Sequence, residues 1–127
     1  MNPSDLGAKG EYLARLYLEK KGFLFIRANY KRPCGEIDLI LQENDEIVFA
    51  EVKTRTLGSA RLYGRGSDKI DEAKRDRIRK TARQFIREET RLTKGLTPRF
   101  DAVEIYVDLK NENKVAVLHT PFAFGFR

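Results

Sequence analysis

The stretch GEIDLILQENDEIVFAEVKTR, residues 35–55, decides the fold of this chain. Two runs with alternating side chains, GEIDLILQ and EIVFAEVKTR, flank Asn44 and Asp45, a pair typical of a tight turn between antiparallel strands. Both faces of each predicted strand are largely apolar, which indicates strands in the middle of a sheet. The charged residues Asp38, Glu51 and Lys53 therefore need an explanation.

The turn sets which residues of the two strands face each other. Successive side chains of a strand point to opposite faces, so one face of the first strand is expected to carry Ile37, Leu39 and Leu41. A loop of either two or four residues places Asp38 opposite Glu51, and Glu36 opposite Lys53. Side chains in that position have Cβ atoms about 4.5–5.5 Å apart, at which two carboxylates repel each other.

A divalent cation between Asp38 and Glu51 would turn this repulsion into attraction. Lys53 would then stand beside the metal, where a lysine can orient or deprotonate a water or neutralise a developing negative charge. The other interpretation is that these are ordinary charges at the solvent end of the sheet, with Lys53 pairing Glu36 or Glu51. Glu11 is expected to join the cluster, because the small residues around it on the first helix allow close approach to the sheet.

The rest of the chain predicts an α/β fold with the order α-β-β-β-α-β-β around a mixed sheet flanked by helices. Residues 4–21 read as a helix capped by Ser4, and residues 23–30 as a strand that ends in a break at 31–33. A glycine-rich loop follows at 56–66. A long helix, capped by Ser67, is predicted from Asp68 to about Thr90. The strands PRFDAVEIYVDL and KVAVLHTPF complete the chain.

Composition narrows the class of protein. The 127 residues predict one domain, 1–127, and the net charge of +6 is compatible with a polyanionic partner, nucleic acid first. The single Cys34 favours a reducing compartment, hence the cytoplasm, and no apolar run reaches the length of a membrane span. The single His119 excludes a His-rich metal site, so carboxylates would hold a hard cation such as Mg²⁺.

The combination of GEIDLI and VFAEVKTR carries a resemblance to known families. The arrangement of Asp38, Glu51 and Lys53 on neighbouring strands resembles the PD-(D/E)xK nuclease superfamily, whose restriction-endonuclease-like core has the αβββαβ order predicted above. The closer match is the bacterial YraN-type family, an uncharacterised family similar to archaeal Holliday-junction resolvases. This resemblance extends through GAKGEYLARLYLEKKGF, NYKRPCGEIDLI, YGRGSDKIDEAKRDRI and PRFDAVEI.

The resemblance implies roles for individual residues. Asp38 and Glu51 correspond to the superfamily's metal-binding carboxylates, Lys53 to its catalytic lysine, and Glu11 to the helix glutamate that completes the acidic cluster. Ile37 stands where the superfamily often has proline. The implied activity is hydrolysis of DNA, including branched DNA, with Mg²⁺ or Mn²⁺. A homodimer is implied because symmetric junction resolution needs two active sites. The alternative is a nucleic-acid-binding module without activity.

Basic residues around the second helix are the expected nucleic-acid contacts. Four arginines recur every four residues and are expected to form a solvent-facing ridge, of which the last two are the stronger phosphate contacts: Arg75, Arg79, Arg83 and Arg87. The other interpretation is a solvated charged face, in which Asp71 pairs with Arg75 and Asp76 with Arg79. The loop after Lys53 contributes Arg55, Arg61 and Arg65. Lys74 interrupts the apolar stripe of the helix, either as a lysine whose ammonium group reaches solvent or as a ligand of the scissile phosphate.

Overall fold

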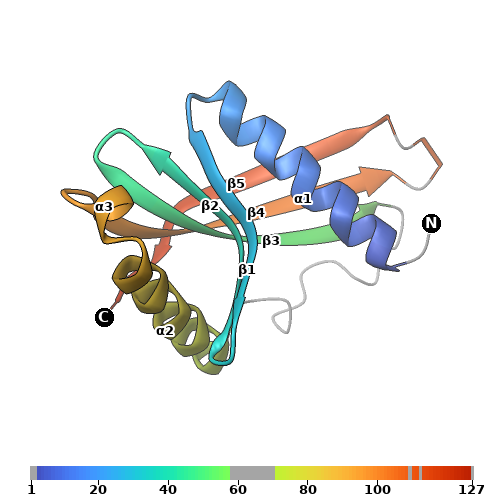
Figure 1. The fold of residues 1–127 in the computed structure, drawn as a ribbon. Helices are drawn as coiled ribbons and strands as arrows, with labels where there is room; N and C mark the ends of the chain where they lie inside the picture. Colours follow the sequence, from blue (N-terminus) through green and yellow to red (C-terminus); the bar gives the residue numbers. More distant parts are fainter. Residues whose placement is uncertain (1–2, 58–70, 109, 112, 127) are drawn as a thin grey trace.

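A computed structural model describes residues 3–57, 71–108, 110–111 and 113–126 of the chain (Figure 1). Its elements follow the predicted order, with one additional short helix, α3. In chain order they are α1 (Pro3–Lys20), β1 (Leu24–Arg32), β2 (Gly35–Glu43), β3 (Glu46–Leu57), α2 (Glu72–Glu88), α3 (Thr90–Thr93), β4 (Thr97–Asp108) and β5 (Val115–Phe124). Among the helices that the structure describes, none is long and apolar enough to cross a membrane.

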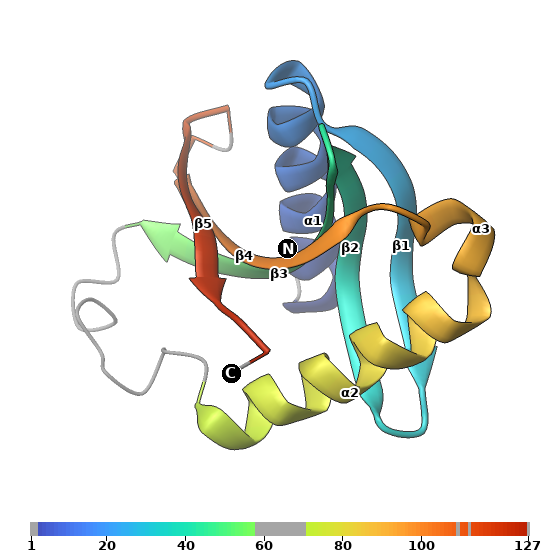
Figure 2. The same cartoon turned by 90° about the vertical axis from the view of Figure 1, so that its left-hand side faces the viewer.

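The five strands form one mixed sheet in the order β1-β2-β3-β4-β5, which confirms the predicted α/β class. Neighbouring strands are antiparallel except β3 and β4, which are parallel. A parallel pair needs a long crossover, and the segment that contains α2 and α3 supplies it. The views in Figures 1 and 2 place α1 against one face of the sheet and α2 on the opposite side.

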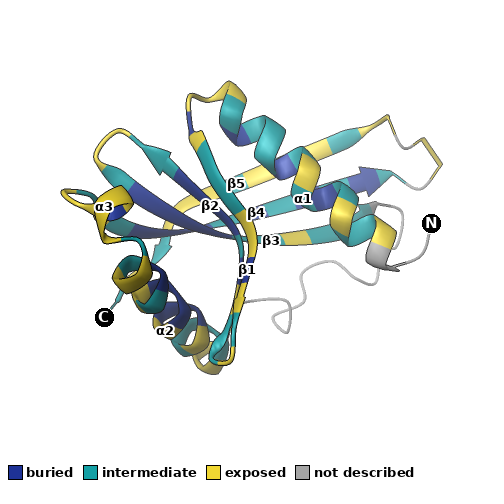
Figure 3. Ribbon diagram, in the orientation of Figure 1, coloured by how far each residue is buried: buried dark blue, intermediate teal, exposed yellow. Residues whose placement is uncertain are grey.

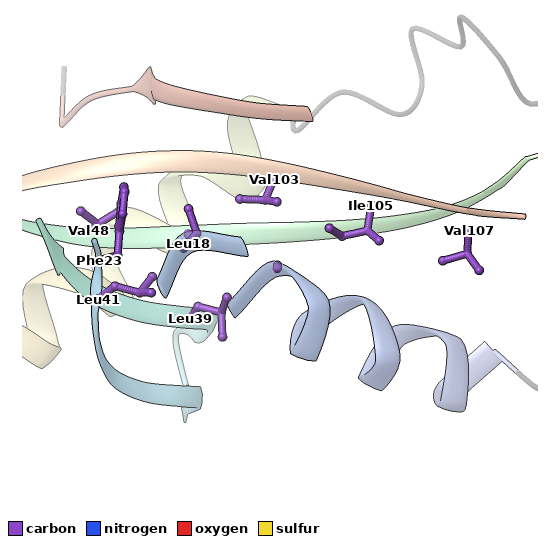
Figure 4. Packing of buried hydrophobic residues seen from close by; sticks show 10 residues of the cluster. Leu18, Phe23, Leu39, Leu41, Val48, Val103, Ile105 and Val107 are labelled. Atoms are coloured by element: carbon purple, nitrogen blue, oxygen red, sulfur yellow. The ribbon is translucent and has the colours of Figure 1, made fainter. Parts of the chain in front are cut away.

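Each face of the sheet has its own apolar core. The first core packs beneath α1 and includes Leu18 of the helix with Leu39, Val48 and Ile105 of the strands (Figure 4). The second core joins α2 to the other face through aromatic and aliphatic residues: Tyr30, Ile40, Ile47, Phe49, Ile78, Ala82, Phe85 and Phe100. The buried strand centres in Figure 3 explain why β2 and β3 are apolar on both faces.

Helix α1 lies unusually close to β3 because Gly10 has no side chain at the contact. A Cβ atom placed on Gly10 would lie 1.8 Å from the side-chain oxygen of Thr54, whereas one on Gly7 would meet nothing within 4 Å. Only glycine permits this approach. The contact matters for the site because Glu11 is the next residue along the helix.

Three predicted element boundaries were wrong. Helix α2 begins at Glu72, because Asp71 has an extended backbone and caps the helix by accepting a hydrogen bond from the Lys74 N–H at 2.8 Å. The predicted cap, Ser67, lies outside the described residues. Strand β1 continues through the predicted break, since Lys31 pairs with Glu36 and Arg32 with Gly35. Strand β3 likewise extends two residues into the predicted loop, to Leu57.

A buried charged network fixes the start of β4. Arg99 donates to both carboxylate oxygens of Asp101 at 2.9 and 2.8 Å, and also to Glu43 and Glu46 beside the β2–β3 turn. His119 of β5 lies 2.8 Å from Asp101. Burial opposes the charge of Asp101, but hydrogen bonds from Arg99 and His119 outweigh it and hold the pKa of Asp101 below its ordinary value.

Candidate active site

Asp38 lies where the β1–β2 hairpin leaves the sheet. The predicted register between β2 and β3 is confirmed from Glu43 opposite Glu46 to Leu39 opposite Ala50, the last regular pair. Beyond that point β3 continues along β4, whereas the hairpin runs towards α2 (Figure 2). The Asp38 carboxylate accepts a hydrogen bond from the Val52 N–H at 2.7 Å. The Asp38 side chain therefore satisfies a backbone donor of β3 at the point where β2 and β3 separate.

The hairpin also changes direction at Asp38. On its other side, β1 pairs Ala28 with Leu39 and then Tyr30 with Ile37, and Asn29 between them has a φ angle of 53°. Such a positive φ is uncommon outside glycine and marks a local bend. The expectation that Ile37 shares a face with Leu39 was wrong, because beyond the bend Ile37 packs into the core beneath α2.

The carboxyl groups of Asp38 and Glu51 are close enough to share a proton. Burial is the main cause that raises the pKa of Asp38 to about 8, and the charge of Glu51 adds to it. A hydrogen bond between the two carboxyl groups acts in the same direction, while the Val52 N–H partly opposes the shift. Asp38 and Glu51 are therefore close to each other, as predicted. They are not a regular pair of the β2–β3 ladder, however, because their side chains meet where the two strands separate.

Lys74 of α2 supplies the cation at this site. Its ammonium nitrogen lies 2.5 Å from Oε2 of Glu51, whose side chain is only 13% exposed. Burial disfavours the charged lysine, yet the hydrogen bond and charge of Glu51, together with Asp38, raise the pKa of Lys74 overall. The description of Lys74 as a lysine that merely reaches solvent is thus incomplete, since its ammonium group pairs directly with Glu51.

Glu11 approaches the cluster from α1. Burial raises the pKa of Glu11, a hydrogen bond with the Asn29 side chain opposes this effect, and the charges of Glu36 and Glu51 add to it. The close contact at Gly10 brings this turn of the helix to the sheet, and the bend of β1 provides Asn29 as a partner. Three predicted residues, Glu11, Asp38 and Glu51, therefore interact electrostatically in the structure.

Among the other charged residues near the cluster, Glu36 occupies a different position from the one expected. Lys53 is exposed on β3, two residues beyond Glu51. The predicted pairing of Glu36 with Lys53 was wrong, because the hairpin has left the sheet and Glu36 instead pairs with Lys31 at 3.8 Å. Arg55 is tied to Glu104 of β4 at 3.2 Å.

The predicted arginine ridge of α2 is only partly exposed. Arg79 is 5% exposed and bonds to Glu72, Asp76 and the carbonyl oxygen of Gly125, so its expected exposure was wrong. Arg83 and Arg87 are exposed as predicted, and the guanidinium group of Arg83 also lies over the ring of Phe126. The predicted contacts Arg61 and Arg65 lie outside the described residues.

The donor set fits a hard cation that brings its own water. Within residues 3–57, 71–108, 110–111 and 113–126, no group of three or more His, Cys, Asp or Glu side chains is arranged to enclose a metal ion. Asp38 and Glu51 provide two carboxylates, and one of them already holds a cation, the ammonium group of Lys74. Mg²⁺ is typically bound by one or two carboxylates together with water and substrate phosphate.

Two features of the site had only weak signals in the sequence. Asn29 is an asparagine inside a predicted strand, and asparagine is enriched at positive φ. Arg77 lines a pocket of about 400 Å³ between α2 and the hairpin, together with Lys31, Arg32, Gly35, Glu36, Lys74 and Ile78. That pocket depends on how the hairpin bends, which residue patterns along the strands do not encode.

Comparisons with known proteins point to one family. The family model described as "Uncharacterised protein family UPF0102" matches residues 10–105. A UPF0102 protein of Caldanaerobacter subterraneus is 37% identical over 124 residues, covering 98% of both chains. Relatives from Caldicellulosiruptor bescii and Treponema pallidum are 40% and 36% identical, over 87% and 94% of this chain and 90% and 91% of their own. The matched region contains the whole acidic cluster.

Proposed function

The chain belongs to the uncharacterised protein family UPF0102, and we propose that it is a metal-dependent endonuclease that hydrolyses phosphodiester bonds in DNA, with branched DNA among its substrates. The observation that carries the proposal is the pair Asp38 and Glu51, two largely buried carboxyl groups brought together where β2 and β3 separate. A buried carboxyl group with a raised pKa, such as that of Asp38, is characteristic of catalytic and metal-binding sites.

A structural role explains this pair poorly. Two adjacent carboxyl groups raise each other's cost of ionisation, and a sheet gains no stability from them. Lys74 offsets part of the negative charge from a neighbouring helix, which indicates that the cluster favours a cation. The absence of imidazole and thiolate from the donor set supports a hard ion such as Mg²⁺ or Mn²⁺.

The residues would divide the work as follows. Asp38 and Glu51 would hold the metal, with Glu11 adding negative charge from α1. When bound, the metal would supply Lewis-acid polarisation of the scissile phosphate and a more acidic water. Lys53 is exposed on β3 two residues from Glu51, and its ammonium group would orient the attacking water. Lys74 would release Glu51 to the metal and become available to the phosphate.

The test is a nuclease assay on duplex, single-stranded and four-way-junction DNA with Mg²⁺ or Mn²⁺. Asp38→Asn and Lys53→Ala should each abolish metal-dependent cleavage while the protein still folds and binds DNA. The asparagine retains an acceptor for the Val52 N–H, so loss of activity would not reflect loss of that bond. Lys110→Ala, at an exposed position between β4 and β5, is the control and should cleave like wild type. Equal cleavage by all four proteins would indicate a contaminant and refute the proposal.

One observation favours a second function, a nucleic-acid-binding module without catalysis. The ammonium group of Lys74 occupies Glu51 directly, and a permanent ion pair would leave the carboxylates unavailable to a metal. In that case wild-type protein would bind DNA but show no cleavage with either metal. It would also show no thermal stabilisation by Mg²⁺ or Mn²⁺.

A further inference from the structure

A basic pocket lies beside the acidic cluster, between α2 and the tip of the β1–β2 hairpin. Its volume is about 400 Å³, and its lining contains four cations and one carboxylate, from Lys31, Arg32, Lys74, Arg77 and Glu36. Lys74 belongs to both sites, since it lines the pocket and pairs with Glu51. The pocket and the carboxylates therefore lie within one lysine side chain of each other.

The cations of the pocket differ in how strongly they are already engaged. Arg32 donates two hydrogen bonds to Glu88, at 3.1 and 2.8 Å, and Lys74 is held by Glu51. Lys31 is 74% exposed and pairs with Glu36 only at 3.8 Å. These contacts leave Lys31 as a loosely held cation in the lining of the pocket.

Arg77 is the cation whose charge is least compensated. In the part of the chain that the structure describes, its guanidinium group has no ion-pair partner, and its charge acts against that of Lys74. An anion placed between Arg77 and Lys74 would relieve this repulsion. The pocket thus combines an uncompensated positive charge with enough room for a phosphate group.

The walls of the pocket are held by direct contact between the hairpin and the helix. A Cβ atom on Gly35 would lie 2.9 Å from the hydroxyl oxygen of Thr81 and 3.3 Å from Arg77, so the hairpin turn meets α2 without a gap. Cys34 reinforces the contact, with its sulfur 3.4 Å from the Thr81 hydroxyl. A pre-formed anion pocket loses less entropy on binding than one that must be assembled.

We propose that this pocket binds the backbone phosphate next to the one that is cleaved, with Arg77 and Lys31 as its contacts. The proposal rests on the nuclease function above and identifies how the substrate strand is held. Asp38 and Glu51 repel a polyanion, so the adjacent phosphate needs cations of its own within reach. Lys74 would join the two positions, because its ammonium group would be free to contact phosphate if a metal were bound by Asp38 and Glu51.

The experiment measures binding of single-stranded and duplex DNA oligonucleotides in EDTA as a function of salt concentration. Each phosphate contact contributes about 0.7 to the log–log slope for single strands and about 0.9 for duplex. Lys31→Ala combined with Arg77→Ala should lower the slope by about one to two. Arg77→Lys, which retains the charge, should keep most of the slope. Both residues are exposed, so the fold should be retained.

The matched control removes the same charge from a distant surface. Lys110→Ala combined with Lys114→Ala changes two exposed lysines beyond β4 and should leave the slope within about 0.3 of wild type. A pocket variant with the wild-type slope overturns the pocket, even if metal-dependent cleavage is observed. A lowered slope in EDTA, together with no cleavage in the separate assay with Mg²⁺ or Mn²⁺, supports phosphate binding in the pocket and refutes the nuclease function. Wild-type protein that binds neither oligonucleotide refutes the pocket.

Discussion

Asp38→Asn should make the metal-free protein more stable at alkaline pH while it abolishes cleavage. The folded protein holds the pKa of Asp38 at about 8, against an ordinary value of 3.8. A raised carboxyl pKa favours folding below the ordinary value, and this contribution is lost as the pH rises through the folded value. The unfolded chain ionises freely, whereas the folded chain must either keep the proton or accept a charge beside Glu51.

The size of the change in the free energy of unfolding follows from the pH interval over which Asp38 titrates differently in the folded and unfolded states. One pKa unit corresponds to about 1.4 kcal/mol, so stability would fall by roughly 4 kcal/mol between pH 5 and pH 8 if Asp38 remained fully protonated in the folded protein. Asp38 is not fully buried and the ammonium group of Lys74 compensates the charge of Glu51, so we expect about half of this, roughly 2 kcal/mol. Asparagine has no proton to lose in this pH range, so Asp38→Asn should not show this fall in stability.

Urea denaturation in EDTA at pH 5 and pH 8 measures the effect. The advantage of Asp38→Asn over wild type should be about 2 kcal/mol larger at pH 8 than at pH 5. Asp45→Asn is the control, because it makes the same chemical change at an exposed turn position and should stay within about 0.5 kcal/mol of wild type at both pH values. An Asp38→Asn advantage that is the same at both pH values would refute the reasoning.

Three further predictions concern the metal, the helix surface and the packing of α1. Glu51→Gln should lose the rise in melting temperature that Mg²⁺ or Mn²⁺ gives wild type; an unchanged response would place the metal elsewhere. Arg83→Ala with Arg87→Ala should lower the salt slope of DNA binding by about one to two, and a wild-type slope would mean that this surface does not touch phosphate. Gly10→Ala should destabilise the protein by about 1–3 kcal/mol in urea, whereas Gly7→Ala, in open space, should stabilise it by up to about 1 kcal/mol; equal effects would contradict the close contact.

The strand pattern was sufficient to predict that Asp38 and Glu51 would meet. A tight turn at Asn44 sets the register of the hairpin, and the alternation of side chains then carries it to the cluster. The extrapolation fails for the residues just before Asp38, Ile37 and Glu36, because it assumes that β2 stays beside β3. The bend depends on the positive φ of Asn29 and on packing of the hairpin against α2, neither of which is a local property of the strand.

Contacts from the helices were harder to predict for a related reason. Helical spacing shows that Lys74 interrupts an apolar stripe, but its pairing with Glu51 depends on where α2 crosses the sheet. The spacing of the four arginines suggested a uniform exposed ridge. Arg79 is buried instead, because Glu72 and Asp76 from the same helix and a carbonyl group near the end of the chain surround it. Periodicity along one helix does not reveal which face a distant segment will cover.

The sheet contains two aspartates with opposite environments, and the contrast separates a structural carboxylate from the one that we propose to be functional. Asp101 is only 1% exposed, yet Arg99, His119 and a backbone N–H satisfy it and its pKa is lowered. Asp38 receives one backbone N–H, faces another carboxyl group, and has its pKa raised. Burial alone is therefore not the cause of the difference.

At Asp101 an arginine, a histidine and a backbone N–H stabilise a buried carboxylate. Asp38 lacks comparable partners among the described residues and accepts one backbone N–H. At Asp38, β2 and β3 separate and their backbone hydrogen bonding ends. The carboxyl groups of Asp38 and Glu51 lie together at this point. Unfavourable features that collect at one point are expected where a ligand completes the arrangement. A cation at Asp38 and Glu51 would remove the repulsion, so the same substitution that stabilises the metal-free protein should eliminate its activity.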